Sequence, residues 1–149
     1  MKQLFRFTLV MIMAVFANNA MAQITKVPQA AKDNFEKQYP NAENAKWYND
    51  IISATVLFEI NGESMNAEYN NKGIWKSTEK TITYEKLPAP VVDGFKKSKY
   101  ADRTVSETKI IYYPGNVMQY RIKAEKNDVE KKYVFFDETG RLVRDAFTL

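Results

Sequence analysis

The chain has 149 residues, of which 27% are charged, and it contains neither cysteine nor histidine. Because these two side chains build the usual zinc and copper sites, cysteine nucleophiles and Ser-His-Asp triads, the composition excludes those sites and disfavours most ordinary enzymes. The formal net charge is only +4, and the basic residues are scattered among acidic ones instead of forming a stripe, so we expect no nucleic-acid partner. We also predict no cofactor and no metal, and a catalytic protein would have to use paired carboxylates, a Ser-Lys arrangement or a tyrosine.

Residues 1–22 have the pattern of a secretory signal peptide. Lys2 and Arg6 precede an apolar run at residues 7–17, and the Ala-Met-Ala at residues 20–22 places small side chains at the two positions that a signal peptidase reads. The run is shorter than the roughly 20 residues that cross a bilayer, and no cysteine follows that could carry a lipid. We therefore predict cleavage before Gln23 and a periplasmic or secreted protein, not a lipoprotein, without a stable membrane anchor.

Two amphipathic helices are predicted, and their sequences are nearly the same. In residues 27–39, apolar side chains recur every four positions, a spacing that places them on one helical face. The stripe returns sixty positions later in residues 87–100, with the pairs Val27/Leu87, Pro28/Pro88, Ala31/Val91 and Phe35/Phe95. Each proline suits the first helical turn, where its missing N–H is not needed. We interpret the two segments as the openings of a duplicated unit.

After the first helix, the sequence alternates between apolar and polar residues, a period that predicts strands. The dipeptide Asn61-Gly62 separates two such runs and is a strong signal for a type I′ hairpin. The stretch from Asn70 to Gly73 suits a type I turn closed by a left-handed glycine. The predicted strands of this half are residues 44–48, 54–60, 63–69 and 74–84.

The second half repeats this order. Its predicted strands are residues 105–113, 117–124, 129–136 and a last one from residue 141 onward. The motif FDETGRL at residues 136–142 corresponds to YNNKGIW at residues 69–75, each with an aromatic residue before an Asn or Asp turn that ends in glycine. The heavily charged residues 123–132 are most simply a solvated hairpin tip.

A helix with one apolar face and a sheet with one apolar face must cover each other. We therefore predict an α+β fold of two tandem units, each a helix followed by a four-stranded antiparallel meander, which together form one extended sheet with the helices on one face. The predicted boundaries are a signal peptide at residues 1–22, a first unit at residues 23–86 and a second unit at residues 87–149.

The repeated stretches resemble the β-lactamase-inhibitor-like, PepSY-like domain family. The resemblance is carried by residues 27–40 with 69–75 and by residues 87–100 with 136–142, and it covers most of residues 25–149. It implies an exported protein of the kind found in the Bacteroidetes envelope, with two tandem α+β units like those of the streptomycete inhibitor of class A β-lactamases and no known catalysis. This chain lacks the disulfides of that inhibitor, and no inhibitory motif can be matched to it position by position.

The sheet face turned away from the helices is the candidate binding surface, because antiparallel sheets commonly leave one face uncovered. Aromatic side chains gathered there would form a patch typical of protein interfaces. Residues 133–136 are aromatic or apolar on both faces of their strand, so either Tyr133 with Phe135 or Val134 with Phe136 faces away from the helices. The candidate partner-binding residues are Tyr113, Tyr133, Phe135, Leu57 and Trp75.

Two candidates have simpler structural explanations. Trp75 should pair with Tyr69 across their turn and point to the same face, which favours the core for both. Asp137-Glu138 could be proposed as a metal or acid/base pair, but an aspartate that opens a turn and a glycine three residues later are ordinary turn chemistry.

The function we predict is a non-catalytic, exported binding or regulatory module that engages a protein or peptide of the cell envelope through the open sheet face. Two alternatives stay open. One is an inhibitor of a secreted protease or β-lactamase that inserts a loop into its target. The other is a carbohydrate-binding protein or a carboxylate-based hydrolase, which would need a cleft with two carboxylates about 5–10 Å apart.

Overall fold

The structure is a computed structural model that describes residues 26–148, and the predicted signal peptide lies outside these residues. In chain order, α2 (Gln29–Gln38) precedes β1 (Glu43–Asn49), β2 (Ser53–Ile60), β3 (Glu63–Asn70) and β4 (Trp75–Ile82). A short 3-10 helix, η1 (Tyr84–Lys86), leads into α3 (Ala89–Lys97), which precedes β5 (Thr104–Tyr113), β6 (Val117–Glu125), β7 (Lys131–Phe136) and β8 (Leu142–Phe147). None of the helices in this described range has the length and hydropathy needed to cross a membrane.

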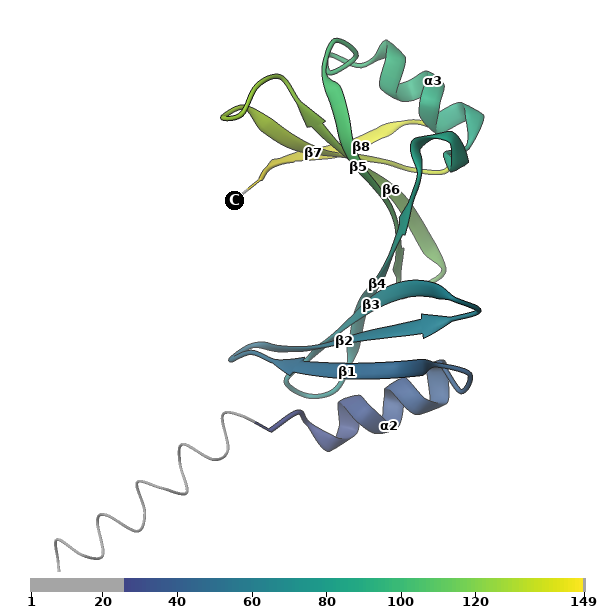
Figure 1. Ribbon diagram of the computed structural model, residues 1–149, viewed down its shortest axis with the longest axis vertical. Helices are drawn as coiled ribbons and strands as arrows, with labels where there is room; N and C mark the ends of the chain where they lie inside the picture. Colours follow the sequence, from purple (N-terminus) through teal and green to yellow (C-terminus); the bar gives the residue numbers. More distant parts are fainter. Residues whose placement is uncertain (1–25, 149) are drawn as a thin grey trace, which may run out of the picture.

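All eight strands form one antiparallel sheet in which chain neighbours are also spatial neighbours, from β1 at one edge to β8 at the other. The ladder continues through the middle of the sheet, where β4 pairs with β5. Figure 1 shows that the molecule has the outline of a C, with α2 at one end and α3 at the other. The predicted α+β class and the single antiparallel sheet are confirmed.

Both helices cover the same face of the sheet. Directly opposed residues of an antiparallel pair point to the same side, and one such row crosses from Met65 through Lys80 and Ile110 to Tyr120. Met65 packs against the core under α2, whereas Ile110 and Tyr120 belong to the packing under α3. The other face, which we call the open face, is covered by no helix among residues 26–148.

A separate hydrophobic core lies beneath each helix. Under α2, the ring of Phe35 meets Phe58 and Trp47 edge to face, with centroids 5.0 and 5.5 Å apart. Under α3, the rings of Phe95 and Phe136 meet in the same manner at 6.4 Å. Burial of one such side chain contributes roughly 1.5–3 kcal/mol, so the apolar stripe predicted for each helix is what attaches that helix to the sheet.

The predicted turns adopt the backbone conformations that their residues favour. At the β2–β3 hairpin, Asn61 and Gly62 have φ angles of 53° and 77°, as a type I′ turn requires. In the β3–β4 turn, Oδ1 of Asn70 accepts hydrogen bonds from the backbone N–H groups of residues 72 and 74. In the β7–β8 turn, Oδ1 of Asp137 does the same with residues 139 and 141.

A glycine in each of the latter two turns lies against the start of a helix. A Cβ atom added to Gly73 would come within 2.6 Å of the Ala30 carbonyl carbon, and one added to Gly140 would come within 2.5 Å of the Pro90 carbonyl carbon. Both glycines also have a left-handed φ, 78° and 82°. Glycine is therefore required at both positions by the backbone and by the approach of the helix.

Most element boundaries differ from the prediction by one to three residues, and local bonding or residue type explains the following differences. β4 ends at Ile82 instead of reaching Tyr84, because the N–H of Leu87 donates to the Tyr84 carbonyl at 3.1 Å and closes η1. β7 begins at residue 131 and not 129, because Oδ1 of Asn127 accepts hydrogen bonds from the N–H groups of residues 129 and 130 and holds them in a turn. The prolines at 28 and 88 stand at the N-cap positions, immediately before the helices.

Candidate functional site

The centre of the open face carries a network of charged side chains. Arg121 donates from Nη1 to Glu79 Oε1 at 2.9 Å and from Nη2 to Glu107 Oε1 at 3.1 Å, and Lys109 Nζ lies 3.0 Å from Glu79 Oε2. The four residues come from β4, β5 and β6, and the register places Lys109 opposite Arg121. The Arg121 side chain is only 13% exposed, so this network is better shielded from water than an ordinary surface ion pair.

The register also determines which residues of β7 face away from the helices. Tyr133 is opposite Lys123, and Phe135 is opposite Arg121, so these two aromatic residues lie on the open face. Val134 and Phe136 point the other way and are fully buried in the core under α3. The strand therefore presents two aromatic residues to the open face, and a valine and a phenylalanine to the core.

The open-face aromatic rings do not form the bare apolar patch that the sequence led us to expect. The guanidinium of Arg144 lies 3.4 Å from the centroid of the Phe135 ring, which is only 4% exposed. The guanidinium of Arg121 lies 4.5 Å from the centroid of the Tyr133 ring. The surface that a partner would meet is thus an aromatic layer covered by arginine side chains, an arrangement stabilised by cation–π attraction.

A hollow of about 250 Å³ brings part of the predicted set together on this face. Its walls include Tyr113 and Phe135, the two arginines, and the acidic residues Glu68 and Glu79. Arg144 is exposed and makes no ion pair with another residue of the range 26–148, which distinguishes it from Arg121. The hollow therefore contains one engaged guanidinium and one that is available to a ligand.

Leu57 also lies on the open face but away from this hollow. The pairing of β1 with β2 places it opposite Lys46, and its side chain is 42% exposed. It borders a different depression near the outer edge of the sheet, together with Glu59 and Ser64. A partner would have to extend across several strands to contact both Leu57 and Phe135.

Trp75 does not belong to the open-face set, and its inclusion there is corrected by the register. It pairs with Tyr69, and Tyr69 is fully buried on the helix side. Its indole Nε1 donates to Thr78 Oγ1 at 2.9 Å, which fixes the ring on that side. The simpler explanation from the sequence, that Trp75 packs with the core, is the one that agrees with the structure.

Sequence reasoning overlooked the two arginines, although they are the most distinctive groups of the hollow. The available signal was weak, because a lysine or arginine on a strand is ordinarily a solvated residue. Only the cross-strand pairs Phe135/Arg121 and Phe135/Arg144 reveal that one ring is flanked by two guanidinium groups. Those pairs require the register, which the sequence does not state.

Asp137 has a structural role in its turn. The hydroxyl of Thr139 donates to it at 2.6 Å, and the Arg141 N–H adds a second bond, so that these bonds lower the pKa of Asp137 to about 2. Glu138 next to it is exposed. Within residues 26–148, no group of three or more carboxylates gathers in a way that could hold a metal ion.

The fold and this site define a class of protein, namely an α+β module with helices on one face of its sheet and an arginine-lined hollow on the other. A sequence profile of the family described as "Putative beta-lactamase-inhibitor-like, PepSY-like" matches residues 52–144. The chain belongs to this family, as its repeated motifs led us to expect. The family is not a catalytic one.

Solved structures agree with this assignment. A BLIP-like protein from Bacteroides fragilis is 25% identical with a TM-score of 0.73, over 83% of this chain and 88% of that one. A DUF2874 family protein from Bacteroides ovatus is 24% identical with a TM-score of 0.73, over 82% and 89% of the two chains. A protein from Bacteroides eggerthii, described as "putative periplasmic", is 22% identical with a TM-score of 0.71, over 82% of this chain and 89% of that one. Among curated proteins, none matches this sequence.

Proposed function

We propose that this protein is a non-catalytic, exported binding module that engages a protein of the cell envelope through the open face of its sheet. The observation that carries the proposal is the exposed guanidinium of Arg144, which lies on the buried ring of Phe135 and forms no ion pair within residues 26–148. Arginine and aromatic side chains are the groups most enriched in binding hot spots.

The recognition mechanism follows from the chemistry of these groups. A guanidinium held flat against a ring loses little conformational freedom on binding and can donate two parallel hydrogen bonds to a carboxylate. Arg144 would receive an acidic side chain of the partner, while Tyr113 supplies an adjacent aromatic surface. Arg121, which already forms ion pairs with Glu79 and Glu107, would form the floor of the site.

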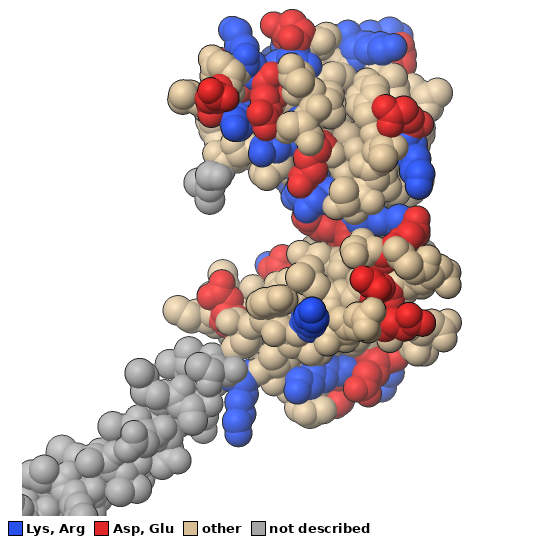
Figure 2. Space-filling model, viewed as in Figure 1, with Lys and Arg blue, Asp and Glu red and all other residues tan. Residues whose placement is uncertain are grey.

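The shape of the molecule supports the same face. Figures 1 and 2 show a notch between the two ends of the C, and the β1–β2 and β6–β7 hairpins lie on the side where it opens. The hairpin tips carry the apolar residues Ile51, Ile52 and Val129, with exposed fractions of 79%, 74% and 94%. Apolar tips on both sides of the polar hollow would contact a convex partner and exclude water from the charged side chains of the hollow.

The proposal is tested by capture of envelope proteins on the immobilised protein, with free protein as competitor. A specific partner is one whose capture the free protein prevents. The variants Arg144→Ala and Tyr133→Ala should no longer capture it. The control Lys96→Ala, at the exposed end of α3, should retain it. A partner retained equally by all variants would show that the open face is not the site.

A second candidate, inhibition of a secreted β-lactamase or protease, is favoured by the family description and by the BLIP-like relative from Bacteroides fragilis. In that function the notch would hold a convex part of the enzyme. Purified protein at micromolar concentration should then slow a member of a panel of such enzymes, and Arg144→Ala should relieve the inhibition. If no enzyme of the panel is slowed, the inhibitor function is excluded and the binding function remains.

We further propose that the chain consists of a cleaved leader (1–22) and two duplicated units (23–86 and 87–149) and that it is periplasmic or secreted. The equivalent turns support the duplication, because Gly73 lies against α2 as Gly140 lies against α3. The description of the Bacteroides eggerthii relative supports the location. The mass of the exported protein tests the leader, since it should begin at Gln23.

A further inference from the structure

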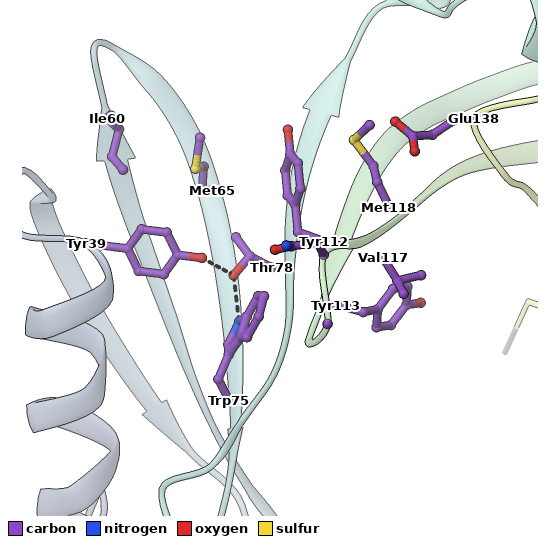
Figure 3. A pocket seen from close by; sticks show the side chains of 12 residues that line it. Tyr39, Ile60, Met65, Trp75, Thr78, Tyr112, Tyr113, Val117, Met118 and Glu138 are labelled. Carbon is purple, nitrogen blue, oxygen red and sulfur yellow. Dashed lines mark hydrogen bonds between the residues drawn. The ribbon is translucent and has the colours of Figure 1, made fainter.

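A second hollow lies on the helix side of the sheet, between the two cores. It has a volume of about 510 Å³ and is walled by both halves of the chain. The first half contributes Tyr39, Ile60, Met65, Trp75 and Thr78, and the second half contributes Tyr112, Val117, Met118 and Glu138, as Figure 3 shows. Hollows of roughly 300–1,000 Å³ are the size that holds small molecules.

The hollow exists because neither helix reaches the middle of the sheet. α2 packs on its own half and α3 on the other, and between the two cores the β4–β5 pair has no helix above it where Thr78 meets Tyr112. At this point Thr78 stands opposite Tyr112, and the small threonine leaves space beside the tyrosine ring. The walls are therefore the flanks of the two cores together with exposed turn residues, namely Gly115, Asn116 and Val117 of the β5–β6 hairpin and Glu138.

The polar atoms at the floor of this hollow form hydrogen bonds with one another. Thr78 is 1% exposed, its Oγ1 accepts the N–H of Trp75 at 2.9 Å, and it shares a hydrogen bond of 2.6 Å with the Tyr39 hydroxyl. Burial raises the pKa of Tyr39, so this hydroxyl stays neutral. The bonds hold the Tyr39 and Trp75 rings in place and leave mainly apolar ring and aliphatic surface for a ligand.

The ionised side chain in the lining of this hollow is negative. Glu138 is the one ionisable carboxylate in the wall, and no lysine or arginine of the described chain lines it. In Figure 3 the Glu138 carboxylate points toward Met118. The wall also contains two methionines and four aromatic rings, those of Tyr39, Trp75, Tyr112 and Tyr113. Aromatic faces and thioethers both suit polarisable, positively charged ligands.

We propose that this hollow binds a flat, apolar small molecule that carries a positively charged nitrogen. The body of the molecule would lie between the Trp75 and Tyr112 rings, and its cation would face Glu138. Anionic amphiphiles would be disfavoured by the same carboxylate. Tyr113 lines this hollow as well as the one on the open face, but the proposal does not depend on the function proposed for that face.

The test uses a fluorescent aromatic cation, berberine, with 8-anilinonaphthalene-1-sulfonate as an aromatic anion for comparison. Berberine should bind the full protein saturably at one site and quench tryptophan fluorescence, whereas the anion should bind more weakly. Glu138→Gln should weaken berberine about fivefold, the scale of an exposed charge pair. The matched control Asp128→Asn, which removes an exposed carboxylate from the β6–β7 tip, should leave affinity unchanged.

A second variant examines the cavity itself. Met118→Lys would place a cation in the wall, and it should abolish berberine binding while the urea midpoint shows that the protein remains folded. Glu138→Gln lies on an exposed turn and remains informative even if Met118→Lys does not fold. Equal affinity for the two dyes, or berberine binding that Glu138→Gln leaves unchanged, would overturn the proposal.

Discussion

Substitution of Gly140 by alanine should destabilise the protein far more than the same change at Gly62. Both glycines have a left-handed φ, 82° and 77°, and alanine in that conformation costs about 1–2 kcal/mol. At Gly62 nothing lies within 4 Å of the added Cβ, so this is the whole expected cost. At Gly140 the Cβ would also press on the Pro90 carbonyl, and overpacking of this kind adds about 1–3 kcal/mol. The expected losses are thus about 2–5 kcal/mol for Gly140→Ala and about 1–2 kcal/mol for Gly62→Ala.

Urea unfolding followed by circular dichroism measures both values. Gly94→Ala separates the two causes, because Gly94 is helical and alanine there would by itself favour the helix by about 1 kcal/mol. Its Cβ, however, would lie 2.9 Å from the Gly140 carbonyl carbon, so the variant should be destabilised despite the better helix propensity. Equal losses for Gly140→Ala and Gly62→Ala, together with a stabilised Gly94→Ala, would refute the contact between α3 and the β7–β8 turn.

Three further predictions concern charge, acid stability and packing. Arg121→Met should lower the free energy of unfolding by about 1–3 kcal/mol, because Glu79 and Glu107 lose their charged donor. The control Lys97→Met removes only an exposed ion pair and should change it by less than about 0.5 kcal/mol; urea titrations measure both values. The bonds from Thr139 and Arg141 depress the pKa of Asp137 in the folded state, so the stability they add is present above about pH 4 and lost as the pH falls through about 2. Asp137→Asn should flatten the stability profile in that window, and an unchanged profile would contradict the assignment. Phe35 and Phe95 occupy equivalent positions of the two cores, and replacing either with alanine should lower the free energy of unfolding by about 3–5 kcal/mol in the same titrations. A decrease below about 1 kcal/mol at either position would contradict the burial described for it.

Much of the fold could be predicted because local chemistry specifies it. Asn61-Gly62 adopts the one hairpin geometry that suits its residues, and the four-residue stripes of both helices end up buried. Strand alternation also divided β7 correctly into two faces, although it could not say which face was covered. That choice depends on the packing of Phe136 beneath α3, a contact between residues far apart in the chain.

The site was harder to predict, because it is made by pairs that span the sheet. Arg144 covers Phe135 from a neighbouring strand, so an aromatic residue that the sequence marks as exposed is in fact buried. The hollow on the helix side depends on β4 pairing with β5, and the chain between these strands passes through η1 and α3. No local pattern encodes the register across such a connection. The core position of Trp75, in contrast, follows from its pairing with Tyr69 across a short turn, which the sequence does indicate.

Site-specific photo-crosslinking in the cell envelope tests the central claim, that the open face binds a protein. A photoreactive amino acid would replace one of two exposed residues: Leu57 on the open face, or Lys96 on the outer side of α3. The account predicts a discrete crosslinked partner from position 57 that unlabelled protein competes away and that Arg144→Ala removes, with none from position 96. A competed partner crosslinked from position 96 and absent from position 57 would contradict it.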